Sequence, residues 1–97
     1  MRITSILLLL GLTFPAVASA TELRLAWVDN SPNETGFLIE RRTETEETFI
    51  PFDKVDADIT SYVDYTTEAG ITYCYEVRAV NSEDTSAPSN EVCSQAQ

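Results

Sequence analysis

The sequence has no histidine and only three glycines, two cysteines and one methionine among its 97 residues. Without histidine, neither a Ser-His-Asp triad nor a histidine-ligated metal site can form. Carboxylates are plentiful because the chain is acidic, and none stands in a motif typical of a catalytic cleft. We therefore predict no catalytic residue, no metal and no cofactor. A small hydrolase is the alternative, but nothing in the composition suggests that activity.

Basic residues are scarce as well. The chain has six lysines and arginines against 16 aspartates and glutamates, a net charge of −10. Nucleic acids and anionic membrane surfaces bind proteins through cationic patches, so both are disfavoured as partners. The simplest role for the negative charge is to keep the protein soluble.

Only one long apolar run is present, and it lies at the N-terminus. A positive charge at the second residue, apolar residues from Ile6 to Phe14 and the small residues Ala18-Ser19-Ala20 are typical of a signal peptide. An uncleaved membrane anchor is the alternative, but a spanning helix needs about 20 apolar residues and Pro15 ends this run early. We predict cleavage after Ala20, leaving residues 21–97 as one secreted or periplasmic domain without a membrane span.

Alternation of apolar and polar residues dominates residues 21–97, and no segment shows helical spacing. Leu23, Leu25 and Trp27 form one such pattern, and the alternation in residues 73–80 is the clearest. Turn residues separate the segments, which favours an all-β sandwich of about six strands. The expected strands are residues 23–28, the segment around 37–39, and residues 48–55, 60–65, 73–80 and 90–94.

Five short motifs follow one another along residues 21–97: Trp27-Val28-Asp29-Asn30-Ser31, Asn33-Glu34-x-Gly36-Phe37-x-Ile39-Glu40-Arg41, Thr60-Ser61-Tyr62-x-Asp64, Gly70-x-Thr72-Tyr73-x-Tyr75-x-Val77-Arg78-Ala79-Val80-Asn81 and Ser86-Ala87-Pro88-Ser89-Asn90. In this order and spacing they resemble a bacterial fibronectin type III domain, an immunoglobulin-like β-sandwich. The resemblance implies an exported, non-enzymatic module that contacts proteins or polysaccharides. The family's first strand is missing or very short here, because only Thr21 and Glu22 precede Leu23.

The aromatic residues are expected to fill the space between the two sheets. An exposed binding platform is the alternative for Trp27, but its alternation with Leu23 and Leu25 favours burial. The resemblance implies a tyrosine corner at Tyr73, with its hydroxyl bonded to backbone near residues 67–70. The predicted structural core comprises Trp27, Ile39, Tyr62, Tyr73, Tyr75 and Val77.

The two cysteines, Cys74 and Cys93, are predicted to form a disulfide, because an even count behind an export signal favours one. Alternation turns both outward on the last two strands. An antiparallel register that sets them opposite each other also sets Val80 opposite Ala87. A reactive redox pair is the alternative, but it lacks the close spacing and basic surroundings of such pairs.

The polar segment from Asp29 to Gly36 is interpreted as a connection between strands. Its alternative is a cation site built from Asp29, Asn30, Asn33 and Glu34, although the spacing matches no calcium-loop signature. The same objection applies to a site made from Asp53, Asp56 and Asp58.

Charges suggest a register between the strands that contain Phe37 and Tyr73. Setting Glu40 opposite Arg78 also sets Arg42 opposite Glu76 and Leu38 opposite Val80. Two complementary ion pairs and one apolar pair then share a single register, which is why we expect it.

Without a preceding strand, residues 23–28 would form a sheet edge with unpaired backbone groups. Such an edge can accept a strand from a partner or from a second copy of the chain. The function hypotheses are thus a binding module for an unknown protein or polysaccharide, and a structural subunit that self-associates or accepts a strand at Leu23–Val28. A six-stranded monomer that tolerates its short edge is the simpler possibility.

Overall fold

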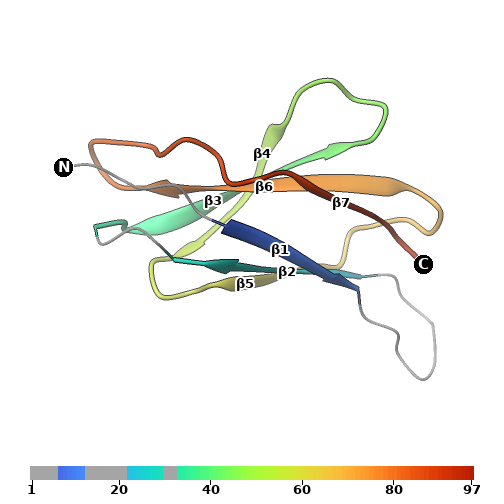
Figure 1. The fold of residues 1–97 in the computed structure, drawn as a ribbon, viewed down its shortest axis with the longest axis horizontal. Coiled ribbons are helices and arrows are strands. Elements are labelled where there is room, and N and C mark those ends of the chain that lie inside the picture. The colour runs from blue at the N-terminus through green and yellow to red at the C-terminus, as the bar shows by residue number, and fades with distance from the viewer. Residues whose placement is uncertain (1–6, 13–21, 30–32) are drawn as a thin grey trace.

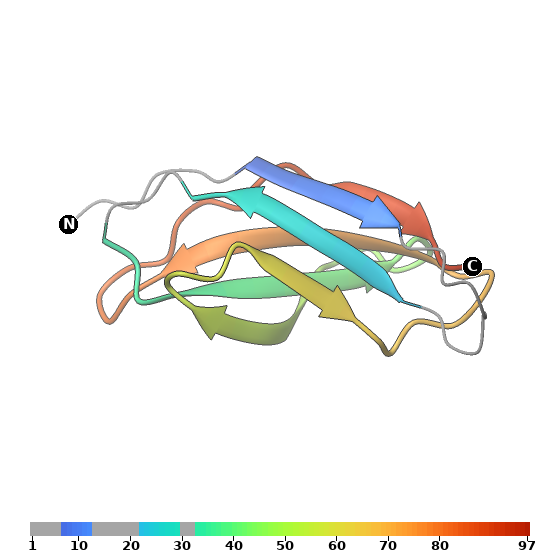
Figure 2. The same cartoon turned by 90° about the horizontal axis from the view of Figure 1, so that it is seen from below.

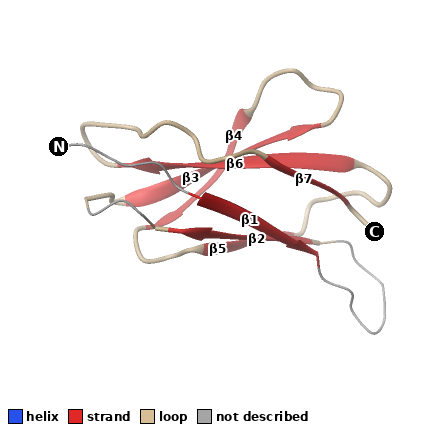
Figure 3. Cartoon of the chain, viewed as in Figure 1, coloured by secondary structure: helices blue, strands red, loops and turns tan. Residues whose placement is uncertain are grey.

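The computed structural model describes residues 7–12, 22–29 and 33–97, and its described part is all-β without helices (Figures 1 and 3). Seven strands alternate with turns and loops. They are β1 (Leu7–Leu12), β2 (Leu23–Val28), β3 (Gly36–Thr43), β4 (Ile50–Asp56), β5 (Ser61–Asp64), β6 (Thr72–Val80) and β7 (Val92–Gln95).

The strands form two sheets that face each other as the layers of a sandwich (Figure 2). Sheet A has the order β1-β2-β5, and sheet B has the order β4-β3-β6-β7. All pairs are antiparallel. The predicted fold class is confirmed: the six strands from β2 to β7 fall in the segments where alternation placed them. Their ends shift by at most two residues, except that β3 runs four residues past its expected segment.

A seventh strand lies in the segment predicted to be the signal peptide. β1 pairs with β2 along its whole length, from Leu7 opposite Val28 to Leu12 opposite Leu23. It therefore occupies the position where residues 21–97 alone supply no strand. The proposed cleavage site, Ala18-Ser19-Ala20, lies outside the described residues, and removal of the leader stays a prediction.

The core lies between the sheets and is formed by inward residues of β2, β3 and β6. Trp27 packs its ring edge against Phe37, with ring centroids 5.5 Å apart. Tyr62, on the short strand β5, is half-buried at the margin of this cluster. The other five predicted core residues are buried, namely Trp27, Ile39, Tyr73, Tyr75 and Val77.

The predicted register between β3 and β6 is wrong by two residues. Leu38 lies opposite Arg78, and Glu40 lies opposite Glu76. The observed register pairs the buried Phe37 with Ala79, whereas the predicted one would have set it against the polar Asn81. Burial of a phenylalanine side chain contributes about 1.5–3 kcal/mol, more than an exposed ion pair, so the core determines the register.

The same two-residue offset leaves Leu38, Glu40 and Arg42 on the outer face, as predicted, but with different partners. Arg42 lies opposite Cys74, not Glu76, and Leu38 does not meet Val80. Arg78 still reaches Glu40 diagonally, with 2.7 Å between Nε and Oε1.

The disulfide between Cys74 and Cys93 is present, and the two cysteines are directly opposed on β6 and β7. The register does not continue as predicted, because Val80 forms its bridge with Thr85, not with Ala87. Between these points, Ser86 and Ser89 bond to β6 outside a regular strand, each through its backbone N–H and its hydroxyl. Ser89 Oγ accepts from the N–H of Val77, and Ser86 Oγ accepts from the N–H of Ala79.

Candidate functional site

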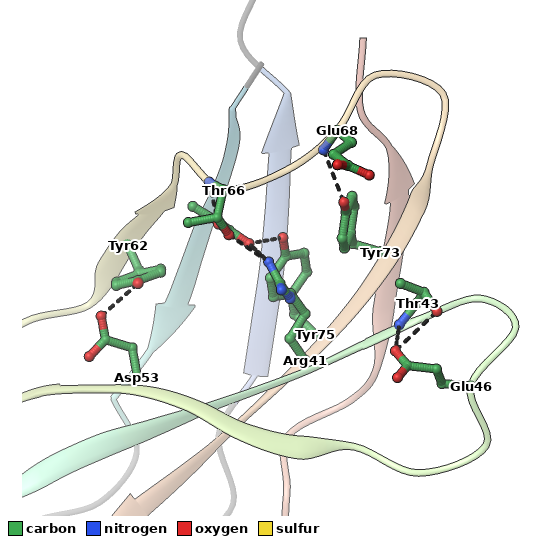
Figure 4. A network of polar contacts seen from close by, with 10 residues as sticks. Arg41, Thr43, Glu46, Asp53, Tyr62, Thr66, Glu68, Tyr73 and Tyr75 are labelled. Carbon is green, nitrogen blue, oxygen red and sulfur yellow. Dashed lines mark hydrogen bonds and ion pairs between the residues drawn. The ribbon is translucent and has the colours of Figure 1, made fainter. Parts of the chain in front are cut away.

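A buried aspartate, Asp64, links the two sheets through Arg41 and Tyr75, which are labelled in Figure 4. Asp64, the last residue of β5, is 1% exposed. Its Oδ2 accepts a hydrogen bond of 2.6 Å from the Tyr75 hydroxyl and forms an ion pair of 2.8 Å with Arg41. Its Oδ1 accepts from the backbone N–H and the hydroxyl of Thr66. Both carboxylate oxygens are therefore fully used.

These bonds determine the protonation state of Asp64. Burial alone would raise the pKa of this carboxyl, but hydrogen bonds from Tyr75, Thr66 and Arg41 outweigh it and lower the pKa. The Tyr75 pKa is raised by burial and by the adjacent carboxylate. Asp64 is therefore an ionised hydrogen-bond acceptor, and Tyr75 holds its proton.

Aromatic rings enclose the arginine of this network. The Arg41 guanidinium lies 4.0 Å from the ring centroid of Phe52 and 5.0 Å from that of Tyr73. Such cation–π contacts hold the Arg41 guanidinium in place beside Asp64. The Tyr73 hydroxyl accepts a hydrogen bond of 2.9 Å from the N–H of Glu68, which lies within the backbone segment expected for a tyrosine corner.

Two carboxylates lie side by side on the outer face of sheet B. Glu40 and Glu76 are directly opposed on β3 and β6, and both are largely buried. Arg78 contacts both, at 2.7 Å from Glu40 and 3.6 Å from Glu76. Burial, together with the hydrogen bond and repulsion from Glu40, raises the pKa of Glu76 to about 7. Near neutral pH, Glu76 is therefore partly protonated.

Of the two alternative cation sites, Asp53, Asp56 and Asp58 do not form a group of potential metal ligands among the described residues. Asn30 lies outside the described residues. Glu34 and Asp29 do interact, and burial and the hydrogen bond to Asp29 raise the Glu34 pKa. In the other proposed set, Asp53 accepts a hydrogen bond of 2.6 Å from the Tyr62 hydroxyl.

One group of three potential metal ligands is found among the described residues: Cys74, Glu91 and Cys93. Both sulfurs are in the disulfide, so they cannot act as thiolate ligands. An open pocket of about 280 Å³ lies between the end of β3 and the start of β6. It is lined by residues 43–45 and 70–72, whose side chains include one carboxylate and no pair of convergent titratable groups.

The pairing of β2 differs on its two sides. Leu23, Leu25 and Trp27 of β2 are buried, whereas Arg24, Ala26 and Val28 are exposed on the outer face. The backbone N–H of Trp27 donates to the carbonyl of Thr60, on the side of β5. On the opposite side, β2 is paired only with the predicted leader. No helix in the described residues is long and apolar enough to cross a membrane.

Sequence reasoning missed the Asp64 network. The alternation of the strand could have revealed it. Tyr62 was placed in the core, and Asp64 lies two residues further along the same strand, so its side chain lies on the same face. A carboxylate at an inward position requires a buried partner. The partner, Arg41, is also an inward residue, two positions beyond Ile39 on β3.

Comparisons with known proteins show the fold and nothing finer. No family model matches the sequence, and no curated protein matches it. An Fn3-like protein from Clostridium thermocellum is 21% identical with a TM-score of 0.68, over 94% of this chain and 86% of that chain. A fibronectin type III domain of human collagen XX is 16% identical with a TM-score of 0.69, over 94% and 88% of the two chains.

A larger protein contains a similar part. Pectate lyase PelI from Erwinia chrysanthemi, in complex with tetragalacturonic acid, is 20% identical with a TM-score of 0.78 over 93% of this chain. This chain spans only 28% of the lyase. The fold of the protein is therefore fibronectin type III-like, in agreement with the resemblance seen in the sequence.

Proposed function

We propose that the protein is an exported, non-enzymatic binding module that contacts a protein or a polysaccharide. The observation that carries this proposal is the fold, because fibronectin type III-like sandwiches commonly serve as binding or structural units. A fold alone does not determine an activity, so the described polar groups provide the second argument. Asp64, Tyr75 and Arg41 are engaged in bonds that link the two sheets, and none lines the pocket.

The partner class follows from charge. Residues 21–97 have five basic and 16 acidic residues, a net charge of −11. A partner that is neutral or basic is favoured over an anionic one. The pectate lyase supports a polysaccharide as one possible ligand, since part of that enzyme has the same fold. The acidic surface argues against polygalacturonate itself, because that polymer is also anionic.

A pull-down from the native envelope and culture medium tests this function. The exported protein is the bait, and a reduced, alkylated and heat-unfolded bait is the control. We expect one polypeptide or polysaccharide to be retained by the folded bait alone. Retention of nothing, combined with turnover of a polymer by the purified protein, would contradict a binding module.

A second candidate function is a structural subunit that accepts a strand at Leu23–Val28. The pairing of β1 with the whole of β2 favours it, because the same edge becomes open when residues 1–20 are removed. Size-exclusion chromatography with light scattering on the exported protein separates a monomer from an assembly.

A further inference from the structure

We propose that the mature protein binds, in the place of β1, an extended apolar strand of a partner polypeptide running antiparallel to β2. This inference rests on the proposed function, specifically on export and removal of the leader. The site is the strand slot, which we define as the space occupied by β1 beside β2. The leader strand shows which chemistry fits it, namely six residues of the sequence LLLLGL in extended conformation.

The register indicates which residues of a bound strand must be apolar. Leu8, Leu10 and Leu12 stand opposite Trp27, Leu25 and Leu23, the three inward residues of β2. Directly opposed residues of an antiparallel pair share one face of the sheet. A strand that fits the slot therefore needs apolar residues at every second position, and its other positions lie beside the exposed residues Arg24, Ala26 and Val28.

The hydrogen-bond ladder gives the slot its backbone specificity. The N–H of Trp27 donates toward β5, and the groups of successive residues point to opposite sides of a strand. The N–H and C=O groups of the even residues, Arg24, Ala26 and Val28, therefore point to the slot. Removing residues 1–20 leaves these groups without the pairing that β1 supplies.

The strand that fills the slot also bridges the two sheets. β1 contacts β7 of sheet B in addition to β2, and it lies between these two strands in Figure 1. Removing it opens the edge between β2 and β7, where β2 carries the inward residues Leu23 and Leu25. An open slot thus combines unpaired backbone groups with apolar surface, which are the two features that favour strand addition.

A partner is a better occupant than a second copy of this chain. Within the described part of residues 21–97, the alternating apolar segments already belong to the strands of the sandwich. A copy could offer only the edges of its own two sheets, namely β2, β5, β4 and β7. Two mature copies would also each have a net charge of −11, which opposes their close approach. A neutral or basic partner strand meets no such repulsion.

A synthetic peptide can serve as the partner strand. The probe is the segment of residues 5–14 with Leu7→Lys, Leu9→Thr and Gly11→Lys, so that leucines remain at the three inward register positions. The control peptide has the same residues in an order that does not alternate. The protein is the exported product, whose N-terminus is read by mass spectrometry. We expect calorimetry to show binding of the probe at least about tenfold tighter than the control.

A matched pair of variants locates the binding. Ala26→Pro removes the N–H that points to the slot and leaves the ladder to β5 intact, since Pro is tolerated at a sheet edge. Ala26→Thr keeps that N–H and is the control. We expect Ala26→Pro to weaken peptide binding at least about tenfold and Ala26→Thr to change it little. Hydrogen exchange should show that the peptide protects the amides of the even residues of β2 and leaves that of Trp27 unchanged.

A self-complemented variant covers the case in which Ala26→Pro fails to fold. In it, the probe sequence is fused ahead of residues 15–97, with the cleavage site altered by Ala18→Leu and Ala20→Leu. The variant should be a monomer that melts at a higher temperature than the exported product and does not bind free peptide.

Four results would overturn the strand slot: an exported product that retains residues 7–12, no discrimination between the two peptides, equal binding by Ala26→Pro, or a β2–β2 dimer. The proposed function is tested separately. A native partner captured equally by wild type and Ala26→Pro would retain the binding module and remove the slot.

Discussion

Asp64 connects the two sheets, which its position in the sequence does not indicate. It lies on β5 in sheet A, yet it binds Arg41 and Tyr75, which lie on β3 and β6 of sheet B. Removing one partner of a buried, charged group leaves a desolvation cost that no water can offset. The stability of the sandwich should therefore be sensitive to each member of this network.

Replacing Tyr75 by Phe removes one bond to Asp64 and retains the ring. Arg41 still satisfies the carboxylate, so we expect a loss of about 1–2 kcal/mol in the free energy of unfolding, measured by urea denaturation. Tyr65→Phe is the matched control, because that side chain is 68% exposed and close in sequence. Equal effects of the two changes would contradict the role given to the Tyr75 hydroxyl.

Replacing Asp64 by Asn tests the charge itself and should cost about 3 kcal/mol at pH 7. Because the folded-state pKa of Asp64 is lowered, its contribution is present above the unfolded pKa of 3.8 and is lost as pH falls through the folded value. The difference between wild type and Asp64→Asn should thus shrink in acid. A difference that stays constant from pH 7 to pH 2 would contradict an ionised Asp64.

The contribution of Glu76 to stability has the opposite pH dependence. Its pKa rises from 4.5 to about 7 in the folded state, so its contribution is present below pH 4.5 and is lost as pH rises through 7. Glu76→Gln imitates the protonated form. We expect it to match wild type near pH 4 and to exceed it by about 1 kcal/mol at pH 8, after allowance for solvent screening. Glu47→Gln, in the exposed hairpin between β3 and β4, is the control.

At the scale of elements, β6 and β7 show where sequence patterns succeed and where they fail. The positions of the two cysteines predicted their pairing, because alternation placed both on one face of adjacent strands. The segment before β7 was harder to predict. Pro88 lacks an N–H, so a regular ladder cannot run through it, and the Ser86 and Ser89 hydroxyls take over.

Reduction of the disulfide tests its contribution without creating a cavity. Closing a loop between residues 19 positions apart should stabilise the fold by about 3 kcal/mol in the chain-entropy model. We expect a clearly lower melting temperature for the reduced protein, with thiol alkylation after quenching as the check on reduction. The pairing would fail as a stabilising link if both forms melted together.

The register of β3 and β6 could not be predicted from charge. Glu40, Glu76 and Arg78 fit several registers that keep them on one face, and a two-residue shift changes only their partners. The inward residues discriminate better, since Phe37 opposite Ala79 and Ile39 opposite Val77 keep the core apolar. Outer-face ion pairs adapt to a register that the core has selected.

At the scale of the whole molecule, the sandwich and most of its strands follow from alternation and turn residues. β1 did not, because its residues form a run of leucines that equally fits a signal peptide. Periodicity cannot distinguish two uses of one apolar segment. The Asp64 network joins residues far apart in sequence and needs the fold before it becomes visible.

Export of the full chain from a bacterial host tests the predicted leader. We expect intact mass spectrometry to show a product that begins at Thr21 and is two protons lighter than its reduced form. Changing Ala18 and Ala20 to Leu should block processing and retain the longer chain in the membrane fraction. A secreted product that begins at Met1 would contradict the signal peptide and would leave β1 as a permanent strand.

The covalent link between β6 and β7 also determines how the domain would carry a mechanical load. A pull on the segment after Cys93 would otherwise peel β7, an edge strand, one hydrogen bond at a time. The disulfide transmits the force to Cys74 in β6, which is paired on both sides. Tearing β6 from the sheet requires its bonds to β3 to break together in shear. The domain would therefore resist tension applied at its C-terminal end far better than its short last strand alone would allow.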